Sequence, residues 1–253
     1  MSKQQVKNEV AAPQRNVLAN LPSEQQSAWG TEDVGQEEVV IPKILLMHGQ
    51  SELVLDKQFA TGDLIKSDPH KLLGNENQSV KVIPFSMSKS WSESEKVGGK
   101  FEWREEYPWT ATNTDQAWEY EKNGTTWRRD KNYNFYALLV SELDDDTCIK
   151  PIKLQFKRTS FRAGKRIASW FSDCKLTKSP PAMKVWEIGA ELIKGDENSY
   201  FVFTSKMGED TPVDYVNSCY TWFKFIKDNA DKVSDHHVEE EAATTVSEEE
   251  RKF

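Results

Sequence analysis

Basic residues mixed with aromatic ones are the feature of this sequence best suited to binding a ligand. No acidic residue occurs from Thr147 to Phe171, and seven basic residues do: Lys150, Lys153, Lys157, Arg158, Arg162, Lys165 and Arg166. A second stretch, WRRDKNY, places Arg128, Arg129 and Lys131 beside Trp127 and Tyr133. A single nucleic acid strand needs cations for its phosphates and flat rings for its unstacked bases.

We therefore expect these residues to form one groove for a single strand. Its parts would be the segments 149–158 and 161–171 and the WRRDKNY stretch, with Trp127, Tyr133 and Trp91 stacking on bases. The alternative is a solvated basic surface above buried aromatic side chains, a composition found in many proteins. The nine tryptophans of the chain favour the first interpretation, because a core of this size rarely needs so many.

The C-terminal stretch EEEAATTVSEEERKF is a second candidate site, for a protein partner. Glu248, Glu249 and Glu250 are followed by Arg251, Lys252 and Phe253. Runs of glutamate repel one another and stay solvated. Such a tail can cover a basic groove until a nucleic acid displaces it, and Phe253 would then anchor the tail in a pocket of another protein.

Motifs of catalysis, metal binding and cofactor binding are missing, so we expect no enzyme, no metal site and no cofactor. The sequence lacks G-x-S-x-G, H-E-x-x-H and a phosphate-binding loop. The three cysteines and four histidines do not have the spacing of zinc ligands. Three consecutive aspartates, 144–146, are better explained as a turn between two strands than as metal ligands.

The pattern of apolar residues predicts many short strands and two helices. Strands are indicated in VVIPKILLMHG, SVKVIPFSM, GGKFEWREEYPW, TTWRRDKNYNFYALLVSE and TCIKPIKLQFKR. Residues 161–171 fit a helix capped by Thr159 or Ser160, residues 184–207 a hairpin, and residues 212–230 a closing helix. This order predicts a mainly β protein with α additions (α+β), an OB-like barrel with an inserted and a C-terminal helix.

Composition divides the chain into three parts. Residues 1–36 and 231–253 are polar and lack an apolar period, so we expect disordered segments around one DNA-binding domain at 37–230. The chain carries a net charge of −8. No apolar run is long enough for a membrane span, and the start does not resemble a signal peptide. We therefore expect a cytoplasmic protein.

The quoted stretches resemble a known family. EDVGQEEVVIPKILLMHGQSELV with ATGDLI, the helix TSFRAGKRIASWF and the hairpin KVWEI…SYFVF are similar to single-stranded-DNA-binding proteins of tailed bacteriophages. The resemblance implies an OB-like fold, non-specific binding of single-stranded DNA in phage replication and recombination in the infected bacterium, and a tail that recruits replication enzymes. The tails of these proteins often remain acidic to the last residues, whereas Arg251 and Lys252 precede Phe253 here.

In a rival interpretation, the acidic C-terminal tail carries the function of the protein. The chain would then be an acidic interaction protein, either a transcription co-activator of RNA polymerase or a DNA mimic. The tail's partner would be a polymerase or helicase if the protein binds single-stranded DNA, and RNA polymerase if it is a co-activator. The sequence leaves this choice open, together with self-association, site size and DNA-versus-RNA preference.

Overall fold

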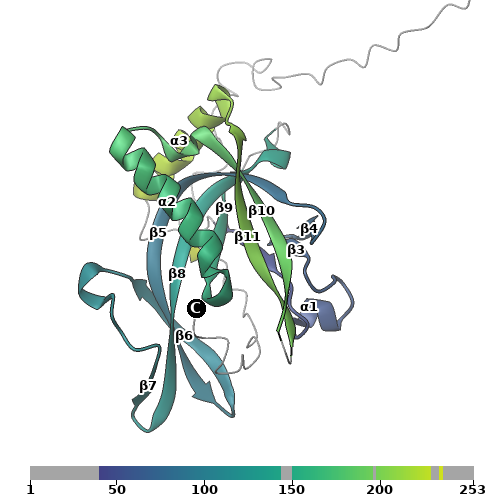
Figure 1. The fold of residues 1–253 in the computed structure, drawn as a ribbon, viewed down its shortest axis with the longest axis vertical. Helices are drawn as coiled ribbons and strands as arrows, with labels where there is room; N and C mark the ends of the chain where they lie inside the picture. Colours follow the sequence, from purple (N-terminus) through teal and green to yellow (C-terminus); the bar gives the residue numbers. More distant parts are fainter. Residues whose placement is uncertain (1–39, 144–149, 196–197, 229–233, 236–253) are drawn as a thin grey trace, which may run out of the picture.

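The protein is a mainly β structure with three helices in the residues that a computed structural model describes, 40–143, 150–195, 198–228 and 234–235 (Figure 1). Its strands are β1 (Val40–Ile41), β2 (Ile44–Leu46), β3 (Leu64–Ser67), β4 (His70–Gly74), β5 (Val80–Val97), β6 (Lys100–Pro108), β7 (Glu119–Lys122), β8 (Thr125–Leu139), β9 (Ile152–Lys157), β10 (Lys184–Lys194), β11 (Ser199–Asp210) and β12 (Ser234–Asp235). The helices are α1 (Glu52–Leu55), α2 (Phe161–Thr177) and α3 (Val213–Asp228).

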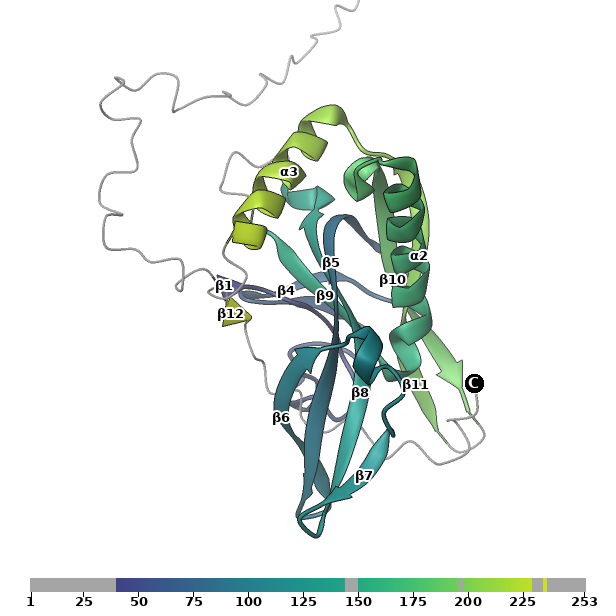
Figure 2. The ribbon, with the colours of Figure 1, turned by 90° about the vertical axis from the view of Figure 1, so that its left-hand side faces the viewer.

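Two long antiparallel strands, β5 and β8, form the axis of the main sheet. They pair from Val82 opposite Leu139 to Glu95 opposite Trp127. Their far ends carry β6 and β7 in tight hairpins, and together these four form an arm that projects from the body (Figure 2). Asn123 and Gly124 turn the β7–β8 hairpin with φ of 56° and 78°, which confirms the turn expected there.

Strand β5 is much longer than its apolar pattern predicts. The apolar run stops near Met87, yet the strand continues through SKSWSESEKV to Val97. In this second half, serines alternate with lysine, tryptophan and glutamate, so the period of two persists although the hydrophobicity does not. The neighbouring strands β6 and β8 supply the hydrogen bonds that hold the polar half in place.

The described strands form open sheets, so the expected OB-like barrel is not confirmed. In the main sheet the order is β11-β10-β5-β8-β7, with β6 also on β5 and β9 also on β8. Strands β11 and β7 lie at opposite ends of this path and do not pair with each other. Because β10 joins β5 only at Val80–Val82, the β10–β11 hairpin diverges from the arm instead of closing on it (Figure 1).

Helix α2 packs on one face of the main sheet. The buried residues beneath it include Phe135, Leu154, Phe156 and Ile167. Gly164 permits the close approach, because a Cβ there would lie 2.7 Å from Cβ of Phe156. The helix begins at Phe161, directly after Ser160, which is one of the two expected caps. The Ser160 side chain makes no capping hydrogen bond, because Ser160 belongs to a 3-10 turn and its hydroxyl accepts a hydrogen bond from the amide of Phe203 on β11.

Helix α3 covers the other face at the end of the sheet away from the arm. A second buried cluster there joins Ile83 and Leu138 of the sheet to Cys219 and Ile226 of α3. The β10–β11 hairpin and this closing helix are confirmed. Within the expected tail, β12 pairs in parallel with β1. None of the described helices has the length and apolar character needed to cross a lipid bilayer.

Candidate functional site

Four aromatic side chains gather on the face of the sheet that carries α2, where the arm meets the body. Trp109 follows β6, and its ring centroid lies 6.1 Å from Trp91, 5.8 Å from Tyr133 and 6.3 Å from Phe161. Tyr133 and Phe161 are 4.7 Å apart. We call Trp91, Trp109, Tyr133 and Phe161 the aromatic cluster. It brings together residues of β5, the β6–β7 connection, β8 and α2.

Two lysines lie over the aromatic cluster. The ammonium of Lys89 is 5.1 Å from the centre of the Trp109 ring, and that of Lys131 is 4.9 Å from it. The register of the sheet explains this placement, since Lys89 pairs with Tyr133 and Trp91 pairs with Lys131. Each strand thus sets a cation opposite an aromatic residue of the other, a favourable cross-strand pair.

These lysines are not neutralised by acidic residues of the described chain. Lys89 is exposed, Lys131 is half-buried, and neither forms an ion pair with a described residue. Trp109 is half-buried, and two positive charges lie within about 5 Å of the centre of its ring. This arrangement can attract an anion that carries a flat apolar group.

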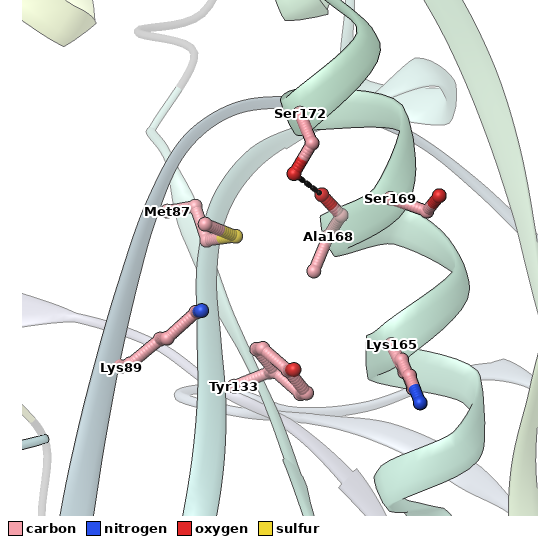
Figure 3. Close-up of a pocket in the computed structure, with 7 residues that line it drawn as sticks. All are labelled: Met87, Lys89, Tyr133, Lys165, Ala168, Ser169 and Ser172. Carbon is pink, nitrogen blue, oxygen red and sulfur yellow. Dashed lines mark hydrogen bonds between the residues drawn. The ribbon is translucent and has the colours of Figure 1, made fainter. Parts of the chain in front are cut away.

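A cavity of about 220 Å³ continues from Lys89 into the space beneath α2 (Figure 3). Its polar lining is Lys89, Tyr133, Lys165, Ser169 and Ser172. Met87 and Ala168 supply the apolar lining. Burial raises the pKa of Tyr133, so its hydroxyl keeps its proton and is a hydrogen-bond donor at neutral pH.

A buried carboxylate anchors the arm on the same face. Glu93 is 3% exposed and accepts hydrogen bonds from Arg129 Nε at 2.5 Å and from the Tyr107 hydroxyl at 2.8 Å. The Arg129 guanidinium also lies 3.7 Å from the centre of the Tyr120 ring. Burial and the neighbouring Glu93 raise the pKa of Tyr107 to about 12. The contacts among Glu93, Arg129, Tyr107 and Tyr120 connect β5, β8, β6 and β7 and stabilise the arm.

Acid should destabilise the protein through Glu93. Burial alone raises the pKa of Glu93, but hydrogen bonds from Arg129 and Tyr107 outweigh it, so the net pKa lies below the usual value. The stabilisation is therefore complete above the unfolded-state pKa of about 4.3 and is lost as the pH falls through the lower folded-state pKa. Urea unfolding between about pH 6 and pH 3 measures this loss. The variant Glu93→Gln should show a smaller decline over that range, and an identical decline would contradict the assignment.

The opposite face of β5, β8 and β9 carries polar side chains bonded to one another. Asn134 donates to Ser90 Oγ at 2.8 Å and to Glu106 at 3.0 Å, and Gln155 donates to Asn134 at 3.1 Å. Asn132 and Asn134 are almost fully buried. Because buried polar groups need partners, this ladder fixes the register of three strands.

The structure does not bring the expected groove residues together on one face. Lys153 and Lys157 pair with Tyr136 and Asn132 of β8, on the face away from α2. The residues between them, Leu154 and Phe156, face α2 and the core. The lysine side chains of β9 and the basic residues of α2 therefore lie on opposite faces of the sheet. Lys153 is also only 4% exposed, whereas Lys150 is exposed just before β9.

The arginines expected to hold phosphates are engaged within the fold. Arg158 binds Asp130 at 2.8 Å, and Arg129 binds Glu93. Arg128 is 6% exposed, with its guanidinium 4.3 Å from the centre of the Trp118 ring. Their charges are balanced by two acids, Glu93 of β5 and Asp130 of β8.

Of the expected stackers, Tyr133 lies at the cavity, and Trp91 is 2% exposed beneath Lys131. Trp127 is half-buried near the end of the arm, 4.5 Å from the ammonium of Lys122.

The basic residues of α2 remain at the surface but face different ways. Arg162, Lys165 and Arg166 are all exposed. Lys165 lines the cavity, while Arg166 turns toward β11 and donates to the carbonyl of Ser205 at 3.2 Å. The expected tail site, Glu248–Glu250 with Arg251, Lys252 and Phe253, lies outside the described residues, as do residues 1–36 and the aspartates 144–146.

Sequence reasoning missed Lys89 and Trp109, which complete the site. Lys89 follows the last apolar residue of the expected strand, and Trp109 follows a proline that ends β6. The alternation Met87, Lys89, Trp91 was the available signal for Lys89, because it continues the period of the strand. No comparable local signal marks Trp109, which reaches the cluster only through the fold of the arm.

The fold and the site define a mainly β protein with an open sheet and a face that combines cations with aromatic rings. The chain belongs to the family described as Pam3 phage gp34-like protein, whose family model matches residues 9–239. No curated protein and no solved structure matches the chain.

Proposed function

We propose that this phage protein binds single-stranded DNA without strong sequence preference on the face formed by β5, β8 and α2. The observation that carries the proposal is the position of Lys89 and Lys131, 5.1 and 4.9 Å from the centre of the half-buried Trp109 ring. Lys165 and Arg162 add exposed positive charge on the adjoining helix. Cations hold the phosphates of the strand, and the indole stacks on an unpaired base.

Local charge is sufficient for such binding although the whole chain is acidic. The net charge of −8 is a property of the entire sequence. Many acids of the described residues are already paired, as Glu93 and Asp130 are with arginines. An unneutralised group of lysines creates a positive local potential, which is what counterion release at a phosphate requires.

Single strands should bind more tightly than duplexes of the same sequence. A duplex hides the faces of its bases, so it cannot stack on Trp109, and each stack is worth about 1–3 kcal/mol. Titration with a labelled oligonucleotide should quench tryptophan fluorescence, and affinity should fall as salt rises, with a log–log slope of about −0.7 per phosphate contact. Equal affinity for single strand and duplex would contradict the proposal.

In this function the protein would protect single strands during phage replication and recombination in the cytoplasm of the infected cell. The acidic C-terminal segment would recruit replication enzymes such as a polymerase or helicase. What supports this second part is the sequence alone: six glutamates in the last fifteen residues, followed by Arg251, Lys252 and Phe253.

A further inference from the structure

The cavity beneath α2 contains a hydroxyl group that lacks a hydrogen-bond partner. Tyr133 is 7% exposed and lines the cavity, and its hydroxyl makes no hydrogen bond with the described residues. Figure 3 shows the Tyr133 ring lying below α2, between Lys89 and Lys165. The Tyr133 hydroxyl is therefore a donor at the cavity that is available to an acceptor on a ligand.

Two cations border the same cavity. Lys89 comes from β5 and Lys165 from α2, so they stand on the sheet wall and the helix wall. Neither forms an ion pair with an acid of the described chain. Ser172 has its own donor engaged with the Ala168 carbonyl at 3.1 Å, and the Ser169 hydroxyl points away from Lys89 and Tyr133 in Figure 3. The polar lining thus consists of donors and positive charges, the combination that binds an oxyanion.

We propose that this cavity binds the terminal phosphate of a nucleic acid strand, an inference that rests on the proposed function and refines it. A cavity of about 220 Å³ is smaller than typical ligand pockets and suits one phosphate with part of its sugar, not a continuous strand. Met87 and Ala168 provide the apolar surface that a sugar can contact.

A terminal phosphate differs from an internal one in charge. A phosphomonoester carries about −1.5 to −2 charges near pH 7 and three acceptor oxygens, whereas an internal phosphodiester carries one charge. Lys89 and the Tyr133 hydroxyl on the sheet wall can bind two of these oxygens, and the flexible side chain of Lys165, whose ammonium points away from Tyr133 in Figure 3, would turn toward the third. The aromatic cluster lies directly beside the cavity, because Tyr133 belongs to both and Lys89, which lines the cavity, lies over the Trp109 ring. The adjoining bases would therefore continue onto Trp109.

The test compares three labelled oligonucleotides of one sequence, with a 5′-phosphate, a 3′-phosphate or no terminal phosphate. We expect one phosphorylated form to bind about tenfold more tightly than the unphosphorylated strand, the gain of one to two charged hydrogen bonds. The two phosphorylated arms identify which end is held. If all three bind equally, this inference fails while the proposed function stands. If none binds, the proposed function itself fails.

Variants locate the effect in the cavity. Tyr133→Phe keeps the buried ring and removes only the hydroxyl, so it should fold normally and reduce the preference for the terminal phosphate several-fold. Lys165→Gln should abolish most of the preference. Lys175→Gln, an exposed lysine of the same helix outside the cavity, is the matched control and should keep it. A preference that survives both cavity variants would place the phosphate elsewhere.

Discussion

Reversing the charges of Lys89 and Lys131 together should weaken binding of single-stranded DNA about a hundredfold at moderate salt. Each lysine that loses a phosphate removes a charged interaction, and two such losses multiply to roughly this factor. The same variant, Lys89→Glu with Lys131→Glu, should also flatten the log–log salt dependence by about 1.4, at 0.7 per contact. Fluorescence anisotropy across a salt series measures both quantities.

The control is a charge reversal of equal size elsewhere on the molecule. Lys175→Glu with Lys178→Glu changes two exposed lysines near the C-terminal end of α2, outside the site, and should weaken binding by much less. A third pair, Lys150→Glu with Lys157→Glu, tests the basic strand predicted from the sequence. Should this pair abolish binding while the Lys89 pair does not, the strand would cross the opposite face of the sheet and our proposed face would be wrong.

Replacing Gly164 with alanine should destabilise the protein by about 2 kcal/mol. A new Cβ would lie 2.7 Å from Cβ of Phe156 and 3.0 Å from Cβ of Tyr133, so α2 has to move away from the sheet. Overpacking of this kind typically costs about 1–3 kcal/mol. Alanine is also the better helix former by about 1 kcal/mol, so a net loss shows that packing outweighs helix propensity. Chemical denaturation of the variant and the parent measures the difference.

Ser169→Ala is the matched control for Gly164→Ala. Ser169 is an exposed position of the same helix, so alanine there should leave stability unchanged or raise it by a few tenths of a kcal/mol. Because the shift of α2 also widens the cavity, Gly164→Ala should alter the preference for a terminal phosphate. An unchanged or increased stability of Gly164→Ala would mean that α2 is not held as closely to β8 and β9 as the contacts imply.

The residues that alternate along β5 and β8 show what the sequence determines. Local spacing decides that Tyr133 and Phe135 share a face, that residues 161–171 are helical, and that Asn123–Gly124 turns the chain. These features depend on neighbours within one or two turns, so a pattern of two or 3.6 residues predicts them. The closing helix and the β10–β11 hairpin were predicted for the same reason.

The site itself depended on contacts between distant segments. The sequence grouped Lys153 and Lys157 with Arg162 and Lys165 because they are close along the chain. The sheet separates them, since β9 turns its lysines to one face and packs Phe156 under α2 on the other. Similarly, the sequence suggested that Arg129 and Arg158 are available to bind phosphates, but Glu93 and Asp130 on other strands neutralise their charges.

The sequence by itself determined the two long helices, the β10–β11 hairpin, where the basic residues concentrate and that the protein is mainly β. Only the tertiary structure decided which cations remain unpaired and which aromatic rings they meet. Lys89 and Trp109 are twenty residues apart and belong to different segments, so their meeting depends on the register of β5 with β6 and β8. Strand register is a cooperative property of the whole sheet, set by many side-chain pairs at once, and no local window contains it.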